Sequence, residues 1–182
     1  MADSKFTTPK FRAAFANVFK AKAAEEGGTP KFSVSMIFDD DAVETPQFKK
    51  LKKAVNALLK EKFGSLPEKQ FNKLKTPFRD CEEKDDMDGY AEGHTFANAS
   101  SLHRPGIVDR ERAQIVEEDD EFYSGCYARA TVTLYAFDKK GNRGVAIGLQ
   151  NLQKLKDGEH FSGRTAAEND FEDLDEDDDF LD

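Results

Sequence analysis

The sequence has no tryptophan, only two cysteines and three histidines, and no long apolar run. Cys81 and Cys126 lie far apart and form no CxxC pair, which fits a reducing intracellular compartment without a disulfide framework. The histidines make no HxH or HExxH pattern, and no glycine-rich phosphate motif is present, so we expect no metal, no cofactor and no enzyme. No segment is apolar enough to predict a membrane span or a secretory signal.

Basic residues are absent from the last 18 positions. The formal net charge is −9, yet ten of the 36 acidic residues lie between Glu168 and Asp182. Residues 1–167 therefore hold 26 acidic and 27 basic residues, a net charge of +1. This asymmetry predicts a folded domain over residues 1–164 and a disordered acidic C-terminal tail over residues 165–182.

Alternation of apolar and polar residues between turn signals predicts most of the folded domain. We expect about five strands, at residues 11–20, 31–38, 94–99, 124–137 and 144–149. Between the second and the third, Thr45 as N-cap and Pro46 at the first helical position begin a helix that ends at Gly64. The expected fold class is therefore mainly β, a small five-stranded barrel with one inserted α-helix and long loops.

Three finer expectations concern local structure. Phe11, Phe15 and Phe19 have the same parity, so an extended chain would place their rings on one face. The polar stretch at residues 76–93 predicts a long loop, of a kind that is often functional. Residues 151–156 predict a short helix.

The expected strand at residues 124–137 carries the clearest candidates for a binding surface. Its small apolar residues share one face, which places Tyr127, Arg129, Tyr135 and Phe137 on the other. Exposed aromatic residues interleaved with a cation are typical of single-stranded nucleic-acid binding, because bases stack on the rings while cations hold the phosphates. The alternative is that these rings pack under the long loop or against the helix.

Further candidates lie outside this strand. Lys31 is on the polar face of the second strand, and Arg79 and Arg104 are in loops that could close over a bound strand. Tyr90, in the long loop, is a further candidate for base stacking. We expect Lys31 and Arg79, together with Arg129, to hold phosphates.

Apolar residues near the end of the acidic tail indicate a role in binding. An acidic segment can compete with DNA phosphates for a basic groove, and an apolar tip can dock on partner proteins. The tail residues that we expect to contact a partner are Phe171, Asp177, Asp178, Asp179, Phe180 and Leu181. The alternative is a tail that only keeps the protein soluble.

Several short segments within residues 11–164 resemble, in content and in order, those of the tailed-phage single-stranded DNA-binding protein family. They include RAAFANVF at 12–19, PKFSVS at 30–35, PFRD at 77–80 and GVAIGLQNLQ at 144–153. This family is similar in architecture to the T-odd phage single-stranded DNA-binding proteins. The resemblance implies an OB fold, coating of single-stranded DNA in phage replication and recombination, and contact of the tail with a polymerase, helicase or primase. The resemblance also implies that the protein is located in the cytoplasm of an infected bacterium.

Two other functions remain open. An interaction module or DNA mimic would work through the acidic tail and use the barrel as a scaffold. A metal-dependent nuclease would use the acidic residues at 82–88, although an acidic loop of this kind is more often simply solvated. The sequence also leaves the oligomeric state open, a homodimer included.

Overall fold

The computed structural model describes residues 5–84 and 87–161. Its longer strands are β2 (Phe11–Lys22), β3 (Lys31–Phe38), β5 (Thr95–Ser101), β7 (Tyr127–Lys139) and β8 (Asn142–Lys156). The short strands are β1 (Lys5–Thr7), β4 (Phe78–Asp80) and β6 (Gly106–Val108). The helices are α1 (Asp40–Val43), α2 (Pro46–Phe63) and α3 (Glu68–Phe71), with 3-10 turns at Cys81–Lys84 and Glu117–Asp119. The candidate tail residues lie outside the described residues: Phe171, Asp177, Asp178, Asp179, Phe180 and Leu181.

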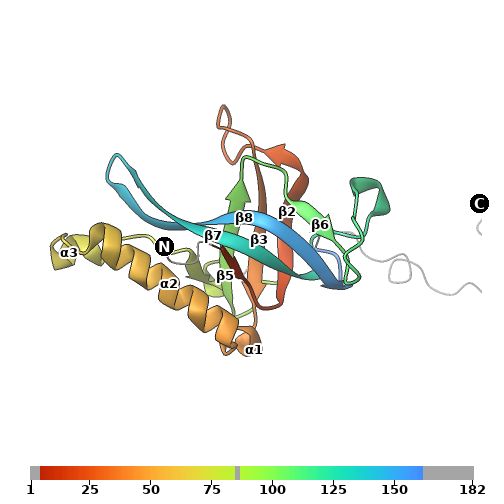
Figure 1. Cartoon of the computed structure of the whole chain (residues 1–182), viewed down its shortest axis with the longest axis horizontal. Coiled ribbons are helices and arrows are strands. Elements are labelled where there is room, and N and C mark those ends of the chain that lie inside the picture. Colours follow the sequence, from red (N-terminus) through yellow and green to blue (C-terminus); the bar gives the residue numbers. More distant parts are fainter. Residues whose placement is uncertain (1–4, 85–86, 162–182) are drawn as a thin grey trace, which may run out of the picture.

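Five strands form a closed ring in the order β7–β2–β3–β5–β8, and β8 pairs back with β7. Neighbours in the ring are antiparallel except β5 and β8, which run parallel. Figure 1 shows the β7–β8 hairpin extending from this ring, with α2 lying alongside it. The expected fold class, a five-stranded barrel of the OB type with one main helix, is confirmed.

The inward faces of the strands fill the ring. Eight inward residues of β3, β5 and β7 are buried: Val34, Met36, Phe38, Ala97, Ala99, Ala128, Ala130 and Val132. The alanines of β5 and β7 leave room for larger rings, and Phe11 meets Phe38 edge to face at a centroid distance of 6.0 Å. Because successive residues of a strand point to opposite faces, the polar residues between them lie on the outside of the ring.

Helix α2 forms at the residues where its sequence signals predict it. The Thr45 hydroxyl accepts a hydrogen bond from the Phe48 backbone N–H at 3.3 Å, and Pro46 occupies the first helical position. Its buried stripe consists of Phe48, Leu51, Val55, Leu59 and Phe63. The C-terminal half of this stripe packs on Val145 of β8, so the helix follows the hairpin. Among the described residues, no helix is long and apolar enough to cross a membrane.

Two local predictions are wrong. Residues 151–156 continue β8, because this stretch pairs with β7 on one side and with β6 on the other, which outweighs a local helical tendency. Phe15 does not share a face with Phe11 and Phe19. It has a positive φ of 47°, lies at a register shift in the β2–β3 pairing and is 51% exposed, whereas Phe11 is 1% exposed. This bulge turns the Phe15 ring outward.

Candidate nucleic-acid interface

Strands β2, β3 and β5 lie side by side and present a continuous outer face. Two cross-strand rows of small side chains line it: Ala14, Ser35 and Asn98, then Asn17, Ser33 and Ser100. We call these six residues the floor. Ala14 and Ser35 are buried under Tyr90, whereas the other four are half-buried or exposed, so a flat ligand can approach the sheet at those four short side chains.

At one end the floor opens into a groove of about 930 Å³. The β2–β3 connection forms one wall and Lys139 of the hairpin contributes to the other. Lys22 and Lys31 are cross-strand partners and bring two more ammonium groups to this groove. Arg104 lies in the loop after β5, with its guanidinium 5.9 Å from the Phe19 ring centroid. The groove lies between the two loops that contact ligands in OB folds.

At the other end of the floor is a cluster of three rings, Phe15, Tyr90 and Phe96, which we call the aromatic platform. The Tyr90 centroid lies 6.2 Å from that of Phe15 and 5.1 Å from that of Phe96. Lys84 Nζ lies 5.4 Å from the Phe15 and Tyr90 centroids and 5.1 Å from that of Phe96. The Arg79 guanidinium lies 5.1 Å from the Phe96 centroid. Since Phe15 is exposed, the platform offers a ring for stacking with cations beside it.

Tyr90 supports the platform from within. Its side chain is only 3% exposed, and its hydroxyl donates a hydrogen bond to Ser35 Oγ at 2.7 Å. Burial raises the pKa of the Tyr90 hydroxyl. This burial contradicts the prediction that Tyr90 stacks on bases, because the ring is covered. Phe15 is the exposed ring of the platform instead.

A third cross-strand row links the platform to Tyr127. In order across the strands, its members are Phe96, Ile37, Arg12, Tyr127 and Lys156. The half-buried Tyr127 ring has cations on several sides, with its centroid 5.4 Å from Lys10 Nζ, 5.5 Å from Arg12 Cζ and 4.6 Å from Lys156 Nζ. Tyr127 and Arg12 also line a hollow of about 180 Å³. The row therefore places the Tyr127 ring and several cations beyond the aromatic platform, at the end of the outer face away from the cationic groove.

Arg12 is held in place by the chain that leads to the tail. Its Nε donates to the Gly125 carbonyl at 3.1 Å, and its Nη2 donates to the Glu159 carbonyl at 2.9 Å. Its guanidinium also lies 4.1 Å from the Phe161 ring centroid. Phe161 packs against the platform and over Gly89, where a side chain would collide with the ring. The described chain thus ends on the outer face.

The remaining candidates on β7 do not gather at one place. Tyr135 is 43% exposed and lies two residues along β7 from Thr133, which is across β8 from Ser100, so Tyr135 borders the floor. Arg129 is exposed, but its Nε donates to Gln153 Oε1 at 2.8 Å on the side of β6. Phe137 is half-buried further along the hairpin. Of these residues, Tyr135 is the one next to the floor.

The acidic stretch that a nuclease would need is partly neutralised. The Arg79 guanidinium donates to Glu83 through Nε at 2.9 Å. Asp85 and Asp86 lie outside the described residues. Within the part of the chain that the structure describes, no three His, Cys, Asp or Glu side chains gather as a metal site would require. The outer face offers aromatic rings, hydroxyls and cations, the groups with which proteins bind single-stranded nucleic acid.

Sequence reasoning missed Phe15 and Lys84. A bulge has no simple sequence signature, and Phe15 keeps the parity of core residues on the same strand. Lys84 is one of many charged residues in a polar loop, and only the folding of this loop onto Phe96 sets it apart. The positive φ at Phe15 was the missing signal, and it is not readable from residue type.

Comparison of the sequence with known proteins points to one family. The sequence model of the family described as "Enterobacter phage Enc34, ssDNA-binding protein" matches residues 4–181. Protein p50 of Acyrthosiphon pisum secondary endosymbiont phage 1 is 31% identical to this chain over 169 residues, which are 90% of each protein.

Solved structures share the fold at lower sequence identity. The single-stranded DNA-binding protein of bacteriophage Enc34, in complex with ssDNA, gives a TM-score of 0.72 at 19% identity, covering 88% of this chain and 90% of that one. The single-stranded DNA-binding protein gp2.5 of bacteriophage T7 gives a TM-score of 0.62 at 14% identity, covering 91% and 99%. Since the family model spans nearly the whole sequence and the phage relative exceeds 30% identity, this chain belongs to the Enc34 ssDNA-binding protein family of bacteriophages.

Proposed function

We propose that this protein binds single-stranded DNA along the outer face of β2, β3 and β5 without reading its sequence. The observation that carries the proposal is the floor of small residues, which lies between a cationic groove and the exposed ring of Phe15. Family membership supports the same ligand, since ssDNA is named in the family's description. The activity is binding and coating, without a chemical step.

Different residues of this face are assigned to base stacking and to phosphate contacts. The residues that we assign to stacking are Phe15, Tyr127 and Tyr135, each able to contribute about 1–3 kcal/mol per base. The residues that we assign to phosphates are Lys31, Arg79 and Lys84. Arg104, Arg129 and Phe137 lie further out and serve as contacts for flanking nucleotides. Every base has a π-face and every nucleotide a phosphate, so the face accepts any sequence.

We also propose that the acidic tail competes with DNA for this face and recruits phage replication proteins such as a polymerase, helicase or primase. The position of Phe161 beside Arg12 supports competition, because the last described residue before the tail lies at the edge of the proposed DNA site. At about 3.3 Å per extended residue, residues 162–182 are long enough to cross it. The protein would then act in replication and recombination in the cytoplasm of the infected bacterium.

Fluorescence anisotropy with labelled oligo-dT tests both proposals. The full chain and a chain that ends at Arg164 are titrated at low and moderate salt, with circular dichroism as the check on folding. We expect binding that weakens as salt rises and that is tighter for the shorter chain. Absence of binding by both forms would overturn the proposal that the protein coats DNA. Equal affinities of the two forms would overturn only the proposal that the tail competes with DNA.

A further inference from the structure

The positive charge of the folded part is concentrated away from the outer face. Residues 46–75 contain nine of the 27 basic residues and only two acidic ones, a net charge of +7. Since residues 1–167 carry a net charge of +1, the rest of that region has a net charge of −6. A polyanion therefore meets its most favourable field at α2 and the segment that follows it.

Five of the exposed lysines of α2 share one side of the helix, which we call the lysine face. Its members are Lys49, Lys50, Lys52, Lys53 and Lys60. Lys49 lies three and four residues before Lys52 and Lys53, a spacing at which like charges destabilise a helix by roughly 0.2–0.5 kcal/mol per pair. Among the described residues, Lys49 is the one member with an acidic partner, Glu44 at 3.2 Å. Such a repulsive surface is typical of a site with an anionic ligand.

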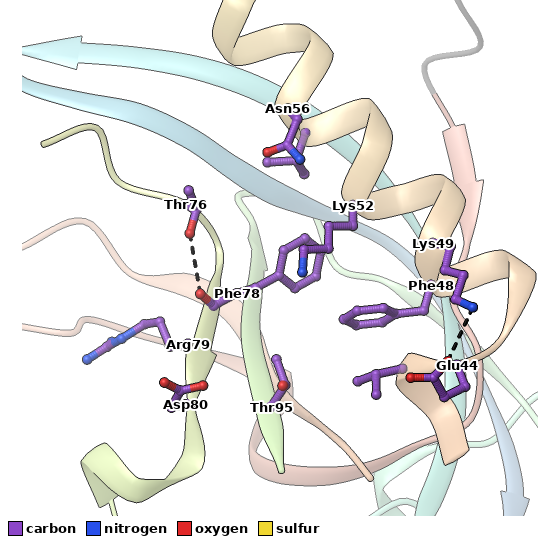
Figure 2. Close-up of a pocket in the computed structure, with 12 residues that line it drawn as sticks. Glu44, Phe48, Lys49, Lys52, Asn56, Thr76, Phe78, Arg79, Asp80 and Thr95 are labelled. Atoms are coloured by element: carbon purple, nitrogen blue, oxygen red, sulfur yellow. Dashed lines mark hydrogen bonds and ion pairs between the residues drawn. The ribbon is translucent and has the colours of Figure 1, made fainter. Parts of the chain in front are cut away.

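A groove of about 520 Å³ connects the N-terminal half of α2 to the outer face. Figure 2 shows Lys49, Lys52 and Asn56 on its helical side and Thr76 on the opposite side. Arg79 follows on β4, with its side chain directed away from α2, and also borders the aromatic platform. The groove, which Glu44 and Asp80 also line, therefore meets the platform at Arg79.

The far end of the helical segment also approaches the outer face. Lys73, just after α3, and Arg143, on the hairpin, line a hollow of about 260 Å³. Lys139, at the tip of the same hairpin, lines the cationic groove of the outer face. The basic segment thus meets the aromatic platform at one end and approaches the hairpin tip that borders the cationic groove at the other.

We propose that the lysine face is a second binding segment for the same DNA strand, one that holds phosphodiester groups. This inference rests on the proposed DNA binding by the outer face. The rings of α2, Phe48 and Phe63, are buried, so the helix offers charge without stacking. Its 18 residues span about 27 Å, enough for several phosphates. Only a strand longer than the outer face gains affinity from this segment.

Glutamine at Lys52 and Lys53 of the full chain tests the inference. Glutamine has nearly the same helix propensity as lysine and relieves the repulsion with Lys49, so α2 should form normally. Binding is measured with oligo-dT of about 8 and of about 20 nucleotides. For the longer strand we expect a loss of about 5–10-fold at low salt and a salt slope shallower by about 1.4, or about 0.7 per lost phosphate contact. The shorter strand should bind unchanged.

The matched control replaces Arg110 and Arg112 by glutamine. They lie on the β6–β7 connection, on the side of the molecule away from α2 in Figure 1, and their loss changes the net charge equally. This variant should bind both strands as the wild type does. Equal weakening of both lengths by Lys52→Gln/Lys53→Gln, or no effect on the longer strand, would overturn the second segment.

Three further outcomes separate the competing explanations. Weakening of the shorter strand alone would mean that the lysine face holds the acidic tail and that the substitutions release it into the outer face, which also overturns the inference. A wild-type chain that binds neither oligonucleotide would overturn the DNA-binding proposal itself. A wild-type chain that binds the shorter strand, with no extra affinity for the longer one, would overturn only the second segment.

Discussion

The outer face of β2, β3 and β5 and the lysine face of α2 are opposite in character. The outer face has small side chains, scattered cations and the exposed ring of Phe15, with Tyr135 at its border, whereas the helix has closely spaced lysines and turns its rings into the core. Each surface suits one half of a nucleotide, the base or the phosphate. The difference teaches that stacking needs a shaped sheet with a local irregularity, while phosphate contact needs only a high density of charge.

The largest effect is expected from Phe15→Ala. Removing an exposed stacking ring should lower affinity for oligo-dT by about 1–3 kcal/mol, or roughly 5–150-fold. The salt slope should stay the same, because no charge is lost, and this would separate Phe15 from the lysine face. Anisotropy at several salt concentrations measures both quantities. Phe15→Tyr should keep the affinity, and an unchanged affinity for a folded Phe15→Ala variant would remove this ring from the site.

Tyr135→Ala tests how far the stacking surface extends. Tyr135 lies at the border of the floor and is less exposed than Phe15, so we expect a smaller loss of about 1–2 kcal/mol in binding. The same titration measures it. Val116→Ala, which shortens an exposed apolar side chain elsewhere, serves as the control. Equal effects of the two substitutions would show that Tyr135 does not stack on bases, and that stacking is limited to the platform and Tyr127.

Tyr90→Phe distinguishes support of the platform from contact with DNA. The substitution removes the hydroxyl that bonds to Ser35, and we expect the free energy of unfolding to fall by about 1 kcal/mol. Affinity for DNA should change little, since the ring itself remains buried. Urea denaturation and anisotropy are the two measurements. A large loss of affinity without a change in stability would return Tyr90 to the binding surface.

The smallest effect concerns Cys81, a free and buried thiol that packs beneath the platform. Burial raises the pKa of the Cys81 thiol from 9.0 to about 11, so at pH 8 the native protein should react with iodoacetamide far more slowly than the protein in urea. Stability linked to this group is complete below pH 9 and declines as the pH rises toward 11. Mass spectrometry follows the alkylation. Fast reaction in the native state at pH 8 would show that the platform opens.

The sequence was sufficient for those elements whose signals are local. The strand at 31–38 and the helix that begins at Pro46 occupy the predicted residues, because strict alternation marks the first and a capping threonine with a following proline marks the second. The same kind of reasoning gave a wrong prediction for residues 151–156, which continue β8 instead of forming a short helix. Their pairing with β6 and β7 comes from other parts of the chain, and ladder hydrogen bonds outweigh a weak helical tendency.

Of the candidate site, the charge pattern was readable and the identity of the exposed rings was not. The sequence by itself determined the acidity of the last 18 positions, the concentration of lysine in residues 46–75 and the inward and outward faces of β7. Net charge and the alternation of apolar and polar residues are properties of short stretches, so both can be determined from the sequence without knowledge of the fold.

Only the tertiary structure decided that Phe15 is exposed and Tyr90 covered, and that Arg12 lies beside Tyr127 in one cross-strand row. These outcomes depend on a bulge in β2 and on the packing of Cys81, Tyr90 and Phe161 onto the outer face. Exposure is set by whatever packs against a residue from distant parts of the chain, and no local pattern encodes it.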